Sequence, residues 1–268
     1  MLMKNKDIIT SESNPQVKRV MQLCQKAKKR QEEGVFIAEG IKMFMEAPVN
    51  LVEKVYVSES AAGNDLVQGK ITAEGLSDEI VSDRIFARMS STQTPQGVLT
   101  VVKKPDFSAA QILDKKDPLI IVLEDLQDPG NAGTIIRTAE GAGADGVFLT
   151  HGSVDITNPK VIRATMGSVY RVPVVYVRTL SELLVKMKQK GIRSYAAHLK
   201  GSCDYDRADF SGGTAFLIGN EGNGLSDEAA GMADTLIRIP MQGSVESLNA
   251  AMAAGILMYE AARQRRCM

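Results

Sequence analysis

The strongest constraint in this sequence is a repeated alternation of short apolar segments with helical stretches, which begins near residue 117. The apolar segments are rich in β-branched residues and have the length of buried strands. Strands that alternate with helices are typical of a mainly parallel sheet covered on both faces, so we predict an α/β fold. In such a sheet, ligands collect outside the carboxyl ends of the strands. The predicted strands are LIIVLE, GVFLT, VPVVYV, RSYAAHL, TAFLIG and TLIRIP.

A change of sequence character between about Lys103 and Asp117 predicts a domain boundary, because proline and charge interrupt the apolar pattern there. Before it, VFIAEG, KVYVS and GVLTVV are candidate strands with helical stretches between them, and the polar segment SSTQTPQ is a loop that leads into the third strand. We predict a small mixed α/β domain over residues 1–105, a linker over 106–116 and the parallel-sheet domain over 117–268.

The composition limits the partners of the chain. Its 32 basic and 32 acidic residues cancel, so a nucleic acid would be held by a local basic patch and not by overall charge. The scattered Cys24, Cys203 and Cys267 fit a reducing compartment, and with only His151 and His198 we expect no metal site. No apolar run has the length of a signal peptide or a membrane span, so we expect a cytoplasmic protein.

The N-terminal region predicts a basic amphipathic helix that is capped by Asn14. Its apolar side consists of Val17, Val20, Met21, Cys24 and Ala27. Its other side carries Lys18, Arg19, Lys26, Lys28, Lys29 and Arg30. This side is either an ordinary solvated face or a contact for a phosphate backbone.

The stretch GAGADG, Gly141 to Gly146, has the glycine spacing of a dinucleotide-binding turn. That turn works only where the glycines follow a strand and open a helix, because the helix N-terminus receives the pyrophosphate. Here a helical pattern precedes the glycines and a strand follows them, so Gly143 is predicted to end a helix. We therefore disfavour a nucleotide-dependent oxidoreductase.

Two of the predicted strand exits carry polar residues in unusual settings. After LIIVLE, the turn Asp128–Asn131 leads into a helix that Asn131 could cap, with Arg137 two turns in. In a purely structural interpretation, Arg137 would pair with Glu140. After TAFLIG, the loop NEGNGLSDE places Glu221 among three glycines, which suits a loop that wraps around a ligand, and Ser226 caps the next helix.

A third strand exit, after TLIRIP, leads into the last predicted helix, which Ser247 and Asn249 begin. Cap duty explains one of these two residues more readily than both. The helix carries a face of small or flexible residues, suited to packing on the sheet or on another subunit. That face consists of Leu248, Ala251, Met252, Gly255 and Tyr259.

Together the three loops bring an arginine, a carboxylate, amides and a hydroxyl to one edge of the sheet. The sequence has no Ser-His-Asp set, paired-carboxylate pattern or P-loop lysine. A polar pocket of this kind favours a group transfer in which a cofactor carries the chemistry.

At these residues the sequence resembles the SpoU-type, or TrmH-like, RNA ribose 2′-O-methyltransferases of the SPOUT superfamily over nearly its whole length. The matching motifs are NAGTIIRTAEGAGAD, LIGNEGNGLS and IPMQGSVESLNAA followed by LMYEA. NPKVIRATMGSVYRVPV is similar to the family's intervening segment, with Thr165 where a serine is more usual. The N-terminal region resembles the substrate-binding domain of members that act on rRNA.

The resemblance implies an S-adenosylmethionine-dependent RNA methyltransferase with a deep trefoil knot that forms a homodimer through the knotted region. Carried over by position, the implied cofactor-binding residues are Gly219, Ile239 and Leu248. The implied catalytic residues are Asn131, Arg137, Glu221, Ser247 and Asn249. The family assigns the removal of the 2′-hydroxyl proton to the arginine that matches Arg137. An arginine normally stays protonated, so it could instead orient an RNA phosphate or stabilise developing negative charge.

The RNA class stays open at this point. The separate N-terminal domain favours rRNA over tRNA, and a non-catalytic RNA-binding or ribosome-assembly protein is the alternative from another functional class. The few aromatic residues offer no obvious platform on which an unstacked base could be read.

Overall fold

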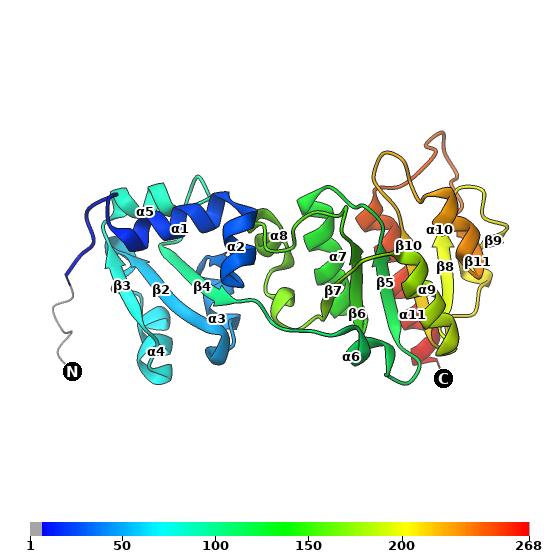
Figure 1. Cartoon of the computed structure of the whole chain (residues 1–268), viewed down its shortest axis with the longest axis horizontal. Coiled ribbons are helices and arrows are strands. Elements are labelled where there is room, and N and C mark those ends of the chain that lie inside the picture. Colours follow the sequence, from blue (N-terminus) through cyan, green and yellow to red (C-terminus); the bar gives the residue numbers. More distant parts are fainter. Residues whose placement is uncertain (1–6, 268) are drawn as a thin grey trace. The chain divides into compact units, whose positions relative to one another are not determined.

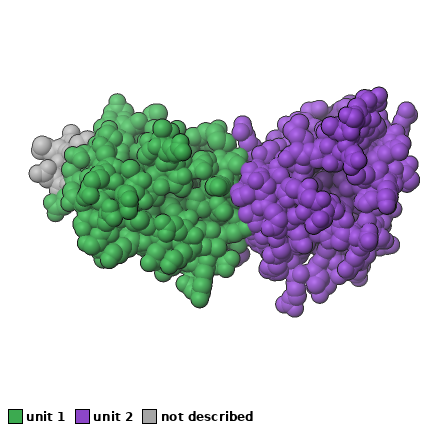
Figure 2. All heavy atoms as spheres, turned by 90° about the horizontal axis from the view of Figure 1, so that it is seen from above, with its two compact units in different colours: residues 1–105, 155–170 green, residues 106–154, 171–268 purple. Residues whose placement is uncertain are grey.

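The computed structural model describes residues 7–267 and divides them between two compact units (Figures 1 and 2). The first unit is the chain up to Pro105 together with Asp155–Tyr170, and the second is Asp106–Val154 together with the chain from Arg171. Residues 1–6 and 268, at the two ends of the predicted domains, lie outside the described part. Within residues 7–267, no helix is both long and apolar enough to cross a membrane.

Seven strands form one sheet in the second unit, in the order β7-β6-β5-β10-β8-β11-β9 (Figure 1). Every pair of neighbours is parallel, which confirms the predicted parallel sheet. All six predicted strands are present, whereas the two-residue β9 carries too little pattern to be found from sequence. The strands are β5 (Leu119–Leu123), β6 (Gly146–Thr150), β7 (Val174–Val177), β8 (Arg193–Ala197), β9 (Cys203–Asp204), β10 (Thr214–Ile218) and β11 (Thr235–Arg238).

Helices cover both faces of this sheet, as predicted. On one face, apolar side chains of α6, α9 and α10 pack against alternate residues of β5, β10 and β8, among them Ile120, Leu217 and Ala196. On the other, α7 packs on β6, and α11 packs on α7, β10 and β5. Successive side chains of a strand point to opposite faces of the sheet, and both faces are covered by helices. This explains why these strands are apolar throughout. The helices are α6 (Ala109–Leu113), α7 (Pro129–Ala142), α9 (Leu180–Gln189), α10 (Asp227–Met232) and α11 (Ala250–Arg266).

The first unit is a mixed α/β structure, as predicted, with a sheet in the order β1-β4-β2-β3. The pairs β1–β4 and β4–β2 are antiparallel, and β2–β3 is parallel. Strand β3 was not predicted, because only its last residue, Val81, is buried and the strand lacks an apolar pattern. The strands are β1 (Val35–Glu39), β2 (Val52–Ser58), β3 (Asp78–Val81) and β4 (Val98–Lys103). The helices are α1 (Pro15–Gln25), α2 (Ala27–Glu33), α3 (Ile41–Glu46), α4 (Asp65–Glu74), α5 (Asp83–Met89) and α8 (Pro159–Thr165).

The helix predicted after Asn14 begins as expected but is broken in two. The Asn14 side chain accepts a hydrogen bond from the N–H of Gln16, which confirms the cap. Lys26 then takes an extended conformation between α1 and α2. Ala27 was placed on the apolar side, but it is exposed at the start of α2, whereas Val17 and Val20 are buried as predicted.

Acidic residues neutralise part of the predicted basic side. Arg19 forms ion pairs with Glu33 at 2.6 Å and with Glu53 at 2.7 Å, and Lys29 pairs with Glu33. Arg30 is buried and pairs with Asp155 at 2.6 Å. A phosphate contact by this helix would therefore depend on the exposed Lys18, Lys26 and Lys28.

The GAGADG stretch is the end of a helix and not a cofactor turn. Helix α7 stops at Ala142, and Gly143 follows in the left-handed conformation with φ +73°. The first residue of β6 is Gly146. The predicted helix-to-strand order is confirmed, and it leaves no helix N-terminus at these glycines to receive a pyrophosphate.

Of the two partners predicted for the face of the last helix, the sheet and another subunit, the sheet is not the partner of Met252 and Tyr259. Leu248 precedes α11, and the side chains that α11 buries include Ala254, Leu257 and Ala261. Met252 and Tyr259 are exposed, with relative accessibilities of 60% and 49%. Small and large apolar residues occur on both sides of this helix, so periodicity could not tell which side faces the sheet.

Candidate active site

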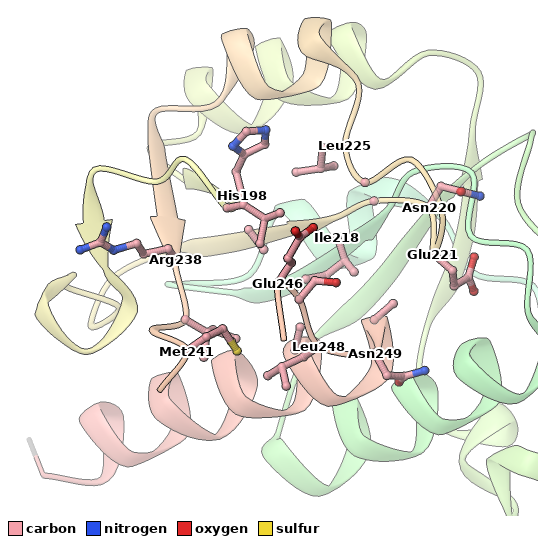
Figure 3. Close-up of a pocket in the computed structure, with 18 of the residues that line it drawn as sticks. His198, Ile218, Asn220, Glu221, Leu225, Arg238, Met241, Glu246, Leu248 and Asn249 are labelled. Carbon is pink, nitrogen blue, oxygen red and sulfur yellow. The ribbon is translucent and has the colours of Figure 1, made fainter. Parts of the chain in front are cut away.

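The carboxyl ends of β8, β10 and β11 open into a cleft with a volume of about 980 Å³ (Figure 3). This edge is where a parallel sheet is expected to bind its ligand. In Figure 3, Glu221 and Asn249 lie at one side of the cleft and Arg238 at the other. The lining comprises Ala197–Lys200, Ile218–Leu225, Ile237–Met241, Val245–Ala250 and Ala253.

The glycine-rich loop after β10 folds back tightly on itself. The backbones of Asn220 and Gly224 exchange two hydrogen bonds of 3.0 and 2.9 Å. A Cβ on Gly219 would lie 2.1 Å from the carbonyl carbon of Gly224, a separation that no side chain tolerates. The Asn220 side chain accepts hydrogen bonds from the N–H groups of Gly222 and Asn223. Glycine at 219 is therefore a steric requirement of the loop that carries Glu221.

A chain of hydrogen bonds links residues from the three predicted loops. The Asn131 side chain donates to Glu221 at 2.9 Å and accepts from the side chain of Asn249 at 2.9 Å. Asn249 in turn caps α11 by accepting from the N–H groups of Ala251 and Met252. The structure thus brings together Asn131, Glu221 and Asn249, which we call the Asn-Glu-Asn chain.

The carboxylate of Glu221 is held in its ionised form. Burial opposes its ionisation, but the hydrogen bonds that it accepts from Asn131 and from the backbone N–H groups of Gln127 and Asp128 outweigh burial and lower the pKa of Glu221. Each bond favours the charged form, because an ionised carboxylate is the stronger acceptor. The loop that follows β5 is thereby fastened to the loop that follows β10.

The cap of α7 differs from the prediction. The side chain of Asp128, and not that of Asn131, caps the helix by accepting from the N–H of Asn131 at 2.7 Å. Asn131 instead lies in the first turn with its amide turned to Glu221. An aspartate and an asparagine three residues apart both have cap chemistry, so sequence alone could not choose between them.

Arg137 and Ser247 are not part of the Asn-Glu-Asn chain. Arg137 is exposed on α7, and within residues 7–267 it forms neither an ion pair nor a side-chain hydrogen bond. The structural interpretation that paired it with Glu140 is wrong, since Glu140 pairs with Arg171. Ser247 is exposed, lines the cleft and lies before α11, so it does not begin the helix as predicted.

The residues predicted to surround a cofactor share one cleft. Gly219, Ile239 and Leu248 all line it. The exit of β8, where His198–Lys200 contribute to the same lining, is not among the three predicted loops. The signal was available, because RSYAAHL was predicted as a strand of this sheet and its carboxyl end had to reach the same edge. In the part of the chain that the structure describes, no group of three or more His, Cys, Asp or Glu side chains could hold a metal ion.

Two family models match the chain. The SpoU rRNA Methylase family matches residues 118–259, and the MRM3-like substrate binding domain matches residues 14–100. The first range contains the cleft and the Asn-Glu-Asn chain, and the second lies within the first compact unit.

Individual proteins are similar over nearly the full length. An uncharacterized tRNA/rRNA methyltransferase of Synechocystis is 34% identical and covers 96% of this chain and 94% of its own length. The 23S rRNA (guanosine(2553)-2′-O)-methyltransferase RlmP of Bacillus subtilis is 32% identical, covering 94% and 97%. The crystal structure of an AdoMet-bound rRNA methyltransferase from Sinorhizobium meliloti superposes with a TM-score of 0.84 at 33% identity, covering 97% of this chain and 98% of that one.

Proposed function

Since this chain belongs to the SpoU rRNA methylase family, we propose that it transfers a methyl group from S-adenosylmethionine to a ribose 2′-hydroxyl of RNA, with ribosomal RNA as the substrate class. The observation that carries the proposal is the Asn-Glu-Asn chain at the side of a cleft lined by Gly219, Ile239 and Leu248. All three sequence motifs meet at this one place.

The cleft fits S-adenosylmethionine in size and chemistry. Its volume is at the upper end of the range for small-molecule sites. Ile218, Ile239 and Leu248 offer apolar surface to an adenine ring, and the backbone groups at the exits of β8, β10 and β11 offer donors and acceptors to its edge. Bound there, the cofactor would supply a methyl group that its sulfonium already activates.

The residues of the Asn-Glu-Asn chain act as a positioning framework for the RNA ribose. Because the methyl group needs no further activation, much of the rate must come from holding the 2′-oxygen in line with it. Glu221 fastens the loops of β5 and β10 to each other, and Asn249 fixes the start of α11 beside them. Ser247, two residues before Asn249, offers a hydroxyl to the ribose or the cofactor from the cleft wall.

Arg137 supplies a positive charge for the RNA. The 2′-hydroxyl is weakly acidic, so its proton needs an acceptor or its oxygen needs stabilisation as charge develops. An exposed guanidinium stays protonated, which favours binding of a phosphate or of the developing oxyanion over direct proton removal. Arg137→Ala is expected to abolish methyl transfer and leave cofactor affinity unchanged, and Arg137→Lys to retain part of the activity. Near-normal turnover by Arg137→Ala would remove the residue from the catalytic set.

A homodimer completes the proposed enzyme. The exposed Leu248, Met252 and Tyr259 give the second unit an apolar surface along α11, and this supports pairing with a second copy. Light scattering of the purified protein measures its oligomeric state. Met252→Lys is expected to give a monomer, because it places a charge on the apolar surface.

The deep trefoil knot and the division into domains 1–105 and 117–268 also belong to the proposal. The two family-model matches support the division. The match of residues 118–259 to the SpoU family supports the knot, which the resemblance implies. An experimental density map of residues 214–266 would test the path of the chain.

The decisive experiment is transfer of labelled methyl from S-adenosylmethionine to unmodified rRNA and tRNA, followed by alkaline hydrolysis and sizing. A 2′-O-methyl group blocks cleavage at its own linkage, so label in alkali-resistant dinucleotides from rRNA is expected. Label in tRNA would change the substrate class, and label in mononucleotides would mean base methylation. Absence of label despite RNA binding would favour the non-catalytic alternative. A protein that modifies rRNA would work in the cytoplasm, which cell fractionation can check.

A further inference from the structure

An aromatic pair of which one ring is exposed lies at the carboxyl edge of the sheet, outside the cleft. The rings of His151 and Tyr176 stack with centroids 5.8 Å apart and planes 15° apart. His151 is exposed and Tyr176 is half-buried, so solvent reaches the pair at the imidazole of His151. By contrast, the rings of Phe36, Tyr170, Tyr195, Phe210 and Phe216 are all buried in core packing.

The register of two parallel strands brings these rings together. Leu149 of β6 pairs with Tyr176 of β7, and Thr150 pairs with Val177. His151 follows two residues after Leu149, on the same side of the sheet as Tyr176, because side chains alternate along a strand. Arg178 follows β7 directly, is exposed, and so lies at the same strand end.

The turn that carries His151 is held rigidly. The Tyr176 hydroxyl donates to the carbonyl of Val154 at 2.7 Å, and the Thr150 hydroxyl donates to Asp125 at 2.6 Å. A Cβ on Gly152 would lie 2.2 Å from a carboxylate oxygen of Asp125, so the loops after β5 and β6 are in close contact. A ring that is already fixed loses little freedom when a ligand stacks on it.

A single residue, Gln127, links the turn of the aromatic pair to the proposed catalytic residue Glu221. The Gln127 side chain donates to the carbonyl of Gly152, next to His151, while the Gln127 N–H donates to Glu221. The turn that carries His151 is therefore joined through Gln127 to the loop that carries Glu221.

We propose that the exposed face of His151, backed by Tyr176, is a stacking platform for an unpaired nucleobase of the RNA substrate. The inference rests on the proposed function. RNA is commonly recognised through splayed bases that stack on aromatic side chains, histidine included. The carboxylate of Asp125 beside Gly152 disfavours a phosphate at this position, so a base is the part of the RNA that fits.

The test measures binding of unmodified 23S rRNA transcript at several salt concentrations. His151→Ala is expected to lower the affinity roughly tenfold with an unchanged salt slope, because a stacked base releases no counterion. His151→Phe should bind nearly as well as the wild type, and His151→Lys should not. Cofactor affinity, measured by calorimetry, should be the same in all variants. Val185→Ala, which trims an exposed residue of α9, is the matched control.

Three outcomes would overturn the platform. The first is wild-type RNA affinity in His151→Ala. The second is wild-type RNA affinity in His151→Lys together with a salt slope that is smaller by about one in His151→Ala, which would mean a phosphate contact. In both cases a wild type that still methylates rRNA leaves the proposed function standing. The third is a wild-type protein that neither binds nor methylates rRNA, which would remove the proposed function and the platform with it.

Discussion

Asn131 is the residue through which the three motifs meet, because its amide is a donor on one side and an acceptor on the other. Its NH₂ group bonds Glu221 and its carbonyl oxygen bonds Asn249. It is 9% exposed, so water replaces these partners poorly when they are lost. No other residue type of this size offers both functions in one planar group.

Asn131→Ala is therefore expected to lower methyl transfer to rRNA about a hundredfold, the scale of a small misplacement of reacting groups. Cofactor affinity should change little, since Asn131 is not among the residues that line the cleft. Single-turnover kinetics and calorimetry measure the two effects separately. Gln189→Ala removes an exposed amide from α9 as a control. A variant of Asn131 with unimpaired turnover would show that the chain of hydrogen bonds is structural only.

The ionised Glu221 makes a contribution to the folding stability that decreases in acid. Its folded pKa lies below the unfolded value, so the stabilisation is fully present above an unfolded pKa of about 4.3 and is lost as pH falls through the folded pKa. Glu221→Gln should be less stable than the wild type at pH 7, with the difference constant down to about pH 5 and shrinking at lower pH. Urea unfolding at several pH values measures this, and a difference that grows in acid would contradict it.

At the scale of elements, the cap of α7 sets the direction of the helix that carries Asn131 and Arg137. The side chain of Asp128 accepts a hydrogen bond from the N–H of Asn131, and the backbone N–H of Asp128 donates one to Glu221. The residue thus couples the start of the helix to the glycine-rich loop, while Pro129 favours the first helical turn.

Asp128→Ala is expected to reduce the free energy of unfolding by about 1 kcal/mol, the usual effect of losing a cap. Asp128→Asn keeps a cap oxygen and should retain most of that stability. Chemical denaturation of the two variants provides the measurement. Equal destabilisation by both would show that the carboxylate charge, and not the cap bond, is what α7 requires.

At the scale of the whole molecule, the first unit contains a segment from the middle of the chain. Ile162, Val169 and Tyr170 are buried against Phe36 and Met43. Arg30 is buried with its guanidinium on Asp155 and Thr157, in the same segment. Removal of the N-terminal part of the chain would expose these apolar side chains to water and leave Asp155 without its partner.

A variant that begins at Asp106 is accordingly expected to aggregate or to unfold at a lower temperature than the full chain. The apolar surface of Ile162, Val169 and Tyr170 would become exposed, and each such side chain contributes about 2 kcal/mol when buried. Calorimetry with and without S-adenosylmethionine compares the two proteins. A truncated protein with the melting temperature of the full chain would show that Asp155–Tyr170 needs no contact with the N-terminal part.

The sequence by itself determined the parallel sheet and the edge of it at which the polar residues of the strand exits gather. The alternation of apolar strands with helices can be read from short stretches of sequence. Gly219 and Glu221 directly follow a predicted strand, and Asn249 directly precedes a predicted helix. The order of helix and strand around Gly143 was enough to reject a dinucleotide turn.

Only the tertiary structure decided which side chains meet. Asp128 and not Asn131 caps α7, acidic residues from other elements pair with Arg19 on the N-terminal basic side, and α11 exposes Met252 and Tyr259. The stacking of His151 on Tyr176 depends on the register of two strands whose paired residues are distant in sequence. The physical reason is the same for all four findings. The partner of a side chain is the group that lies near it in the folded chain, whereas a local sequence pattern gives only the residue type and the face of the element on which it lies.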